Sequence, residues 1–216
     1  MRLLLIRHTA PDIAAGVCYG RLDVSARPAE RDAWLADWDA GRQTGQPWAG
    51  YQRVLSSPAL RCRVLAQALA ARLGLALDID PRWQELDFGA WEGQSWDAIG
   101  RPAVDAWAGD LVHHAPGGGE SVLDMMRRVT RAYEACRHDG RDAVLVCHGG
   151  TIQMLLAWHG ASADETGQRS PTTQAALVRQ DLLERAAARA VQCSAPPVGT
   201  VVQLNIPRYP AGATIQ

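Results

Sequence analysis

Short apolar runs alternate with helical patterns along most of this chain. Mostly apolar segments of strand length predict strands at residues 2–6, 75–79, 143–147 and 200–206, of which the first is expected to be buried, with a shorter one from residue 54 that breaks at 56–58. Apolar side chains at a spacing of three or four residues predict helices at 28–40, 59–73, 122–137 and 152–159, and a weaker helical pattern covers 170–195. Strands that alternate with helices predict an α/β fold, a three-layer sandwich in which a largely parallel sheet is flanked by helices.

Local signals mark where the elements end. Pro58 suits the first turn of the helix at 59–73, with a serine before it as the N-cap, and Gly74 suits its end. Residues 82–119 are rich in Trp, Gly and Pro and follow no single period, so we expect a partly helical cap there. We expect residues 1–206 to form one domain and residues 207–216 to be a disordered tail.

The charge composition argues against nucleic-acid binding. The formal net charge is −1, and the sequence has neither a basic tail nor a basic block. All 22 basic side chains are arginines, because the chain contains no lysine. This excess of arginine is typical of a GC-rich coding sequence, so functional arginines must be recognised by their position.

Cysteine usage and the amino-terminal segment indicate the compartment. The five cysteines are scattered and form no CxxC pair, so neither a disulfide framework nor a zinc site is indicated. The first 11 residues are too short for a signal peptide, and no apolar stretch approaches the roughly 18 residues that span a bilayer. We therefore expect a reduced, cytoplasmic protein with no membrane partner.

Polar side chains follow three of the predicted strands. Arg7 and His8 come directly after the first strand, Ser56 and Ser57 after the second, and His148 after the strand at 143–147. Ligands of parallel α/β sheets bind beyond the carboxyl ends of the strands. We therefore expect these segments to meet at one edge of the sheet, although they are far apart in the sequence.

The residues that meet there suit phosphate chemistry. The planar guanidinium groups of Arg7 and Arg61 match phosphate oxygens, and Gly149 can expose a backbone N–H to an anion at a helix start. A neutral imidazole, from His8 or His148, is a competent nucleophile toward phosphorus near neutral pH. Nearby arginines also neutralise the oxygens of the loose transition state. The pattern predicts phosphoryl transfer on a small phosphate monoester.

Such a reaction also needs a group that protonates the leaving oxygen. The segment "ELDFGAWEG" (85–93) offers two carboxyls, Glu85 and Glu92, among aromatic side chains. The residue pattern alone does not choose between them.

At this point the chain resembles the histidine phosphatase superfamily, the phosphoglycerate mutase-like proteins. The motifs occur in family order over about residues 1–160, and their combination is specific although each alone is weak. They are "LIRH" (5–8), "SSPALR" (56–61), "ELDFGAWEG" (85–93), "PGGGES" (116–121) and "CHGG" (147–150). Within the superfamily, the stretch from Arg7 to Val24 together with 85–93 looks most like the α-ribazole phosphatase group.

The resemblance implies roles for the site residues. His8 would be the phosphorylated nucleophile, and Glu85 the proton donor, with Glu92 in a structural role. The rest of the phosphate pocket would consist of Arg7, Arg61 and His148. The family needs no metal, and we expect no cofactor.

One segment departs from the family pattern. Where the family usually has Gly-Glu-Thr and then an Asn, this chain has Thr9-Ala10-Pro11 and no Asn, so a side-chain donor to phosphate is lost. We expect Tyr19, or the N–H of Gly20, to compensate.

The leading hypothesis is a metal-independent phosphomonoester hydrolase that acts through phosphohistidine, with α-ribazole 5′-phosphate as the candidate substrate. The alternatives are a phosphoglycerate mutase and a non-catalytic protein that binds a phospholigand. The sequence does not identify the natural substrate, the role of residues 160–200 or the oligomeric state.

Overall fold

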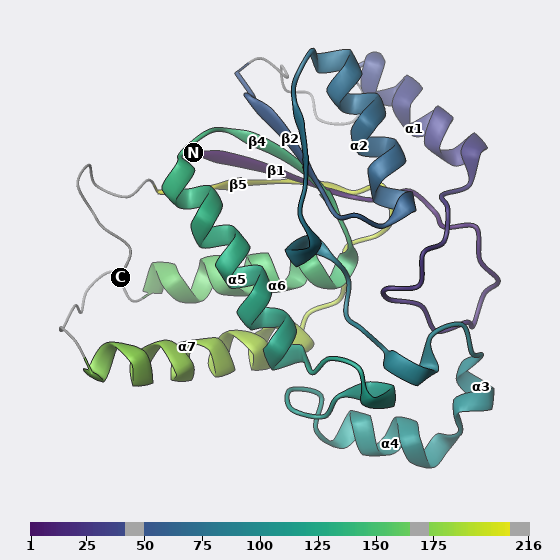
Figure 1. The fold of residues 1–216 in the computed structure, drawn as a ribbon, viewed down its shortest axis with the longest axis vertical. Helices are drawn as coiled ribbons and strands as arrows, with labels where there is room; N and C mark the ends of the chain where they lie inside the picture. The colour runs from purple at the N-terminus through teal and green to yellow at the C-terminus, as the bar shows by residue number, and fades with distance from the viewer. Residues whose placement is uncertain (42–49, 165–172, 208–216) are drawn as a thin grey trace.

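A five-stranded sheet forms the middle layer of the protein (Figure 1). The computed structural model describes residues 1–41, 50–164 and 173–207. The strands are β1 (Arg2–Arg7), β2 (Arg53–Ser56), β3 (Leu77–Ile79), β4 (Ala143–Cys147) and β5 (Val201–Asn205). Their order is β3-β2-β4-β1-β5; β1 to β4 are parallel, and β5 pairs antiparallel with β1. The predicted largely parallel sheet is confirmed.

Helices cover both faces of this sheet (Figure 1). One face carries α1 (Pro28–Asp39) and α2 (Leu60–Leu73), and the other carries α5 (Val122–Asp139), α6 (Gly149–Asp164) and α7 (Thr173–Val191). Alternate side chains of each strand point to opposite faces. In β1, Leu3 and Leu5 join the apolar core under α5 and α6, while Leu4 and Ile6 join the core under α2. The predicted three-layer sandwich is therefore confirmed.

The Trp-rich segment between β3 and α5 consists of short helices and loops. Its elements are η1 (Pro81–Trp83), η2 (Gly89–Trp91), α3 (Trp96–Ile99), α4 (Arg101–Gly109) and η3 (Pro116–Gly118). Its aromatic rings pack together: Trp107 stacks on Trp96 with a centroid distance of 6.2 Å, and Phe88 meets both rings edge-on. This packing holds α3 and α4 together beyond the sheet.

Two helix starts differ from the sequence prediction. Helix α6 begins at Gly149 rather than at residue 152, and the N–H of Gly150 in its first turn is bonded to a side chain, Glu85, from a distant segment. Helix α2 begins at Leu60, so Pro58 lies before the helix and no serine caps it. Instead, the Ser57 hydroxyl accepts the Ala59 N–H at 3.3 Å and contacts a histidine ring, described below.

Two other predictions fall partly outside the described residues. The weak helical pattern at 170–195 corresponds to α7, which the structure describes from Thr173 onward. The expected tail at 207–216 lies outside the described residues from position 208.

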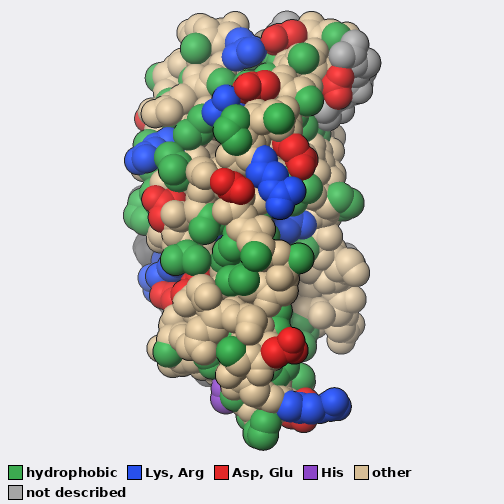
Figure 2. Space-filling model, turned by 90° about the vertical axis from the view of Figure 1, so that its right-hand side faces the viewer, with side chains coloured by type: hydrophobic (Ala, Val, Ile, Leu, Met, Phe, Trp, Pro, Cys, Tyr) green, Lys and Arg blue, Asp and Glu red, His purple; other side chains and the backbone are tan. Residues whose placement is uncertain are grey.

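The surface agrees with the balanced composition. On the face shown in Figure 2, acidic and basic side chains are interspersed rather than gathered into a patch of one sign. Among the described residues, no helix combines the length and the apolar character that crossing a bilayer requires.

Candidate active site

His8 stands at the carboxyl end of β1 with its ring almost fully buried. Its backbone N–H donates to the Cys147 carbonyl at 3.0 Å, which extends the pairing of β1 with β4. Its ring nitrogen Nδ1 lies 2.8 Å from the Thr9 carbonyl, which can only accept, so Nδ1 carries the hydrogen. The other nitrogen, Nε2, therefore keeps a free lone pair.

His148 follows β4 and faces His8. The centroids of the two rings are 5.3 Å apart, and the ring planes meet at 67°. Nδ1 of His148 lies 3.2 Å from Nη2 of Arg61, which can only donate, so Nε2 carries the hydrogen and donates to Ser57 Oγ at 2.8 Å. The contact with Arg61 therefore selects the neutral form of His148, and the contact with Ser57 is compatible with that form.

The surroundings keep both imidazoles neutral. Burial, reinforced by the charges of Arg61 and Arg7, lowers the pKa of His8 to about 3, although its hydrogen bond to the Thr9 carbonyl opposes the shift. Burial and Arg61 lower the pKa of His148 well below its usual range. At neutral pH, His8 is therefore an unprotonated base with an available nitrogen.

Arg61 places a fully buried positive charge beside these rings. Its guanidinium donates to the carbonyls of Gly20 at 2.6 Å and Leu22 at 2.9 Å, and the Tyr19 ring lies 5.5 Å from its Cζ. Within the described part of the chain, no carboxylate lies at ion-pair distance from it, and its Nε has no hydrogen-bond partner. A buried charge without a counterion is costly, so this site favours an anionic ligand.

Arg7 is held beside His8 by the segment that leads into β5. Its Nη1 donates to the Pro196 carbonyl, and the Gly199 N–H lies 3.2 Å and 3.1 Å from the carbonyls of Arg7 and His8. A Cβ on Gly149 would lie 2.9 Å from the Arg7 Cζ. Glycine at position 149 therefore leaves room for this guanidinium.

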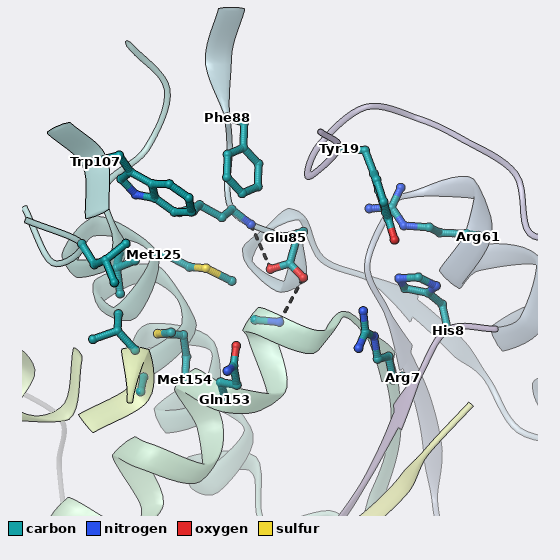
Figure 3. Close-up of a pocket in the computed structure, with 16 residues that line it drawn as sticks. Arg7, His8, Tyr19, Arg61, Glu85, Phe88, Trp107, Met125, Gln153 and Met154 are labelled. Carbon is teal, nitrogen blue, oxygen red and sulfur yellow. Dashed lines mark hydrogen bonds between the residues drawn. The ribbon is translucent and has the colours of Figure 1, made fainter. Parts of the chain in front are cut away.

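Glu85 lies midway along the wall of a cavity of about 380 Å³, which Arg7, His8 and Arg61 line at one end (Figure 3). Its Oε2 accepts the Gly150 N–H at 3.0 Å, and its Oε1 accepts the Leu86 N–H at 3.0 Å. The first of these bonds ties the carboxyl group to the first turn of α6.

Glu92, the other carboxyl of the 85–93 segment, is not part of this wall. It accepts four backbone N–H groups at 2.8–3.0 Å, from Gly20, Arg21, Leu22 and Phe88. Its carboxylate therefore organises two loops, and of the two candidates only Glu85 faces the cavity.

The sequence comparison agrees with this arrangement of two histidines, two arginines and a facing carboxyl. The profile described as "Histidine phosphatase superfamily (branch 1)" matches residues 3–187. The chain belongs to the histidine phosphatase superfamily. It is thus an enzyme of the phosphoglycerate mutase-like phosphatase type, as the motifs predicted.

Similar members of the histidine phosphatase superfamily differ in their named substrates. The chain is 32% identical over 169 residues to a glucosyl-3-phosphoglycerate phosphatase of Mycolicibacterium vanbaalenii, a match that covers 72% of each chain. The α-ribazole phosphatase of Shigella flexneri has the same fold, with a TM-score of 0.71 and 21% identity over 96% of this chain and 91% of that one. A mycobacterial glucosyl-3-phosphoglycerate phosphatase has a TM-score of 0.66 and 24% identity over 94% and 89%.

The structure does not support phosphate binding by the two glycines for which it was predicted, Gly20 and Gly149. The N–H of Gly20 donates to Glu92 at 2.9 Å, and its carbonyl accepts from Arg61. The expectation that this N–H faces the anion was therefore wrong, because Glu92 already binds it. Gly149 does not line the cavity, whereas Tyr19 does.

Several residues of the site were missed by the sequence analysis. Ser57 was expected at this edge of the sheet but without a partner, and neither Gly150 nor Gln153 was given a role in the site. Gln153 lies one turn after Gly149 and Gly150 and points into the cavity (Figure 3), so helical spacing from the "HGG" motif could have found it. Arg128, which binds the backbone of the Glu85 segment as described below, could not have been found, because nothing in the sequence distinguishes it from the other arginines.

The part of the chain that the structure describes contains no group of three or more His, Cys, Asp or Glu side chains placed to hold a metal ion. His113, which is followed in the sequence by a second histidine, His114, is exposed and contacts Asp110 at 3.0 Å.

Proposed function

We propose that this chain is a phosphomonoester hydrolase that works through a phosphohistidine on His8 and needs no metal. One observation carries the proposal: His8, whose Nε2 is left unprotonated by the hydrogen bond of Nδ1, lines a cavity to which Arg7 and Arg61 bring positive charge at one end and Glu85 brings a carboxyl group in the middle (Figure 3). The guanidinium groups of Arg7 and of the fully buried Arg61 supply the charge that binds the phosphoryl oxygens.

In the first step, His8 Nε2 attacks phosphorus and the bond from phosphorus to the ester oxygen breaks. The leaving oxygen takes the proton of the Glu85 carboxyl group as it departs. The hydrogen bond from His8 Nδ1 to the Thr9 carbonyl stabilises the positive charge that forms on the ring. His148 accepts an N–H from Arg61 and thereby orients that guanidinium toward the phosphoryl group.

In the second step, water attacks phosphorus and the phosphorus–nitrogen bond breaks. The Glu85 carboxylate takes a proton from the water, and the electron pair returns to His8 Nε2. Inorganic phosphate leaves, and both residues regain their starting protonation.

The far end of the cavity supports an aromatic substrate group. Beyond Glu85 and Gln153 the wall is apolar, and it is formed by Leu86, Phe88, Trp107, Leu111, Val122, Met125, Met154, Ala190 and Val191. The order of cationic end, polar middle and apolar end matches a phosphate, a sugar and an aromatic base. We therefore propose a nucleotide-like monoester, with α-ribazole 5′-phosphate as the candidate substrate.

The same wall argues against a substrate with a second anionic group. Phosphoglycerate and glucosyl-3-phosphoglycerate carry a carboxylate, which a site normally holds with a second cationic group. Among the described residues, the arginines that line the cavity are Arg7 and Arg61, and both lie at the proposed phosphate end. This disfavours a mutase and favours an ester whose distal part is uncharged.

The state of the thiols supports a cytoplasmic location. All five cysteines are free, and four of them are buried. Free thiols are typical of proteins that work in a reducing compartment.

A panel of phosphate esters, assayed with the purified protein in excess chelator, tests the function. The panel contains 4-nitrophenyl phosphate, α-ribazole 5′-phosphate, glucosyl-3-phosphoglycerate and 3-phosphoglycerate. We expect hydrolysis of the first two, with the highest kcat/KM for the ribazole ester, and an alkali-stable, acid-labile phosphoryl adduct on His8.

Each competing function gives a different result in that panel. Interconversion of 2- and 3-phosphoglycerate without net hydrolysis would assign a mutase. Stabilisation of the fold by phosphate without turnover of any ester would assign a binding protein.

A further inference from the structure

Arg128, a largely buried arginine outside the cavity, binds the backbone of the segment that carries Glu85. Arg128 lies on α5, and its side chain is only 14% exposed. Its Nη1 donates to the carbonyls of Arg82 at 2.9 Å and Gln84 at 2.7 Å, and its Nη2 donates to the Glu85 carbonyl at 2.9 Å. One guanidinium therefore binds three carbonyls within four consecutive residues.

The carboxylate of Glu120 binds the same guanidinium group from its other side. Glu120 accepts from Arg128 at both oxygens, with Nε–Oε1 and Nη2–Oε2 distances of 2.7 Å. Glu120 is itself only 12% exposed, and it also lies 3.2 Å from Nη2 of Arg21. The planar fork of an arginine can make these bonds together, whereas a lysine ammonium cannot.

Helix α6 holds the segment from the opposite side. The Thr151 hydroxyl donates to the Gln84 carbonyl at 3.1 Å, and the Gly150 N–H binds the Glu85 carboxylate at 3.0 Å. Hydrogen bonds therefore anchor the segment at 82–85 both to Arg128 on α5 and to the first turn of α6, the helix that directly follows His148.

We propose that Arg128 is a positioning residue that sets where the Glu85 carboxyl group delivers its proton. The inference rests on the proposed role of Glu85 as the proton donor. Arg128 does not line the cavity, so it acts through the backbone of residues 82–85 and not on the substrate.

Proton delivery is sensitive to such positioning. A general acid must come within about 2.6–3.2 Å of the atom that it protonates. A displacement of about 1 Å, caused by a change away from the reacting atoms, can lower a rate about 100-fold. Loss of Arg128 would release three carbonyl anchors at once and leave Gly150 and Leu86 as the partners of the carboxyl group.

The dependence of the rate on the leaving group reports on this role. An alkoxide is a poor leaving group that needs a proton, whereas 4-nitrophenolate leaves without one. A variant with a misplaced acid should therefore lose activity on an alkyl phosphate far more than on 4-nitrophenyl phosphate. A general loss of structure would lower both rates equally.

The experiment compares kcat/KM for 4-nitrophenyl phosphate and for a simple alkyl phosphate in four variants. They are Arg128→Gln, Arg128→Lys, Arg127→Gln and Glu85→Gln. Arg127 is the matched control, because it is the next arginine on α5 but its partners are Asp124 and Gln180. Thermal unfolding by circular dichroism accompanies each assay, and Arg128→Lys is used alone if Arg128→Gln does not fold.

We expect both Arg128 variants to lose about 10- to 100-fold in kcat/KM on the alkyl ester and about threefold or less on the aryl ester. Arg127→Gln should change neither rate. Equal losses on the two esters in the folded Arg128 variants, or no loss on either, would overturn the inference. If Glu85→Gln itself shows no dependence on the leaving group, the proposed role of Glu85 fails instead, and this inference falls with it.

Discussion

The rings of His8 and His148 meet edge to face, with centroids 5.3 Å apart, although the two residues lie 140 positions apart in the sequence. The parallel pairing of β1 with β4 produces this contact, because Arg7 lies opposite Cys147 in the register and each histidine comes directly after its strand. The two histidines also differ in their partners. Among the described residues, the ring of His8 hydrogen-bonds to the Thr9 carbonyl alone, whereas the ring of His148 bonds to Arg61 and Ser57.

That difference predicts unequal roles in covalent chemistry. Replacement of His8 by Ala should lower kcat/KM for 4-nitrophenyl phosphate at least about 1000-fold, because the nucleophile is lost. It should also abolish the phosphoryl adduct, which can be measured by mass spectrometry after an alkaline quench. The control is His138→Ala, an exposed histidine on α5, which should keep full activity. An active His8→Ala enzyme would remove the proposed mechanism.

Glu85 and Glu92 should separate activity from stability. Glu85→Gln keeps the shape of the side chain but removes the proton donor, so kcat/KM on an alkyl phosphate should fall about 100-fold or more with little change in unfolding. Glu92→Ala leaves four backbone N–H groups without their carboxylate, so the free energy of unfolding should fall by about 2–3 kcal/mol. Urea titration and steady-state kinetics on both variants check this, and the reverse assignment of effects would contradict the roles.

A side chain at Gly150 should lower activity without lowering stability, although this residue lies in a helix. A Cβ at this position would lie 2.3 Å from Glu85 Oε1, so Gly150→Ala must displace the carboxyl group. Since Ala favours a helix over Gly by about 1 kcal/mol, the free energy of unfolding should hold or rise while kcat/KM falls about tenfold or more. A Gly160→Ala variant serves as control, because its nearest neighbour would be the flexible end of Arg189 at 3.3 Å.

The end of the site that holds Arg7, His8 and His148 was predictable, and the contacts around Glu85 were not. Strand β4 matches its predicted bounds, because its five residues are apolar and fully buried. Arg7, His8 and His148 could be placed together from the rule that ligands bind beyond the ends of parallel strands. The pairing of Glu85 with Gly150 depends on how an aperiodic segment folds over α6, which no local pattern encodes. The hydrogen bonds of Arg128 could not be predicted either, because they join α5 to backbone carbonyls, which carry no sequence signal.

The buried histidines should make the protein sensitive to acid. The pKa of His8 is about 3 in the folded protein and about 6.5 in an unfolded chain, so between these pH values only the unfolded chain binds the proton. The free energy of unfolding should therefore decrease as pH falls below about 6.5, by up to about 1.4 kcal/mol per pH unit for this residue. The lowered pKa of His148 adds to the decrease in the same direction.

Urea unfolding at several pH values between 7.5 and 5 measures this effect. His8→Asn removes one titrating group, so its stability should vary less steeply with pH than that of the wild type. Identical slopes in the two proteins would show that His8 titrates normally in the folded state.

Trp107 should bind the distal part of the substrate. Its ring lines the apolar end of the cavity, so Trp107→Leu should raise KM for α-ribazole 5′-phosphate about tenfold and leave KM for glycerol 3-phosphate unchanged. Trp96 is the matched control, because it stacks on Trp107 without lining the cavity. Equal changes in KM for the two esters, or an equal effect of Trp96→Leu, would contradict recognition of a distal aromatic group.

The contact of Arg7 with Pro196 and Gly199 has a consequence for biosynthesis. A ribosome synthesises Arg7 and His8 long before the segment at 196–199 that holds Arg7 in place, because 189 positions separate Arg7 from Pro196. The nascent chain should therefore lack a correctly placed Arg7 until this segment has been translated. Chains cut short before residue 196 should be inactive toward phosphate esters even when their earlier strands and helices have formed.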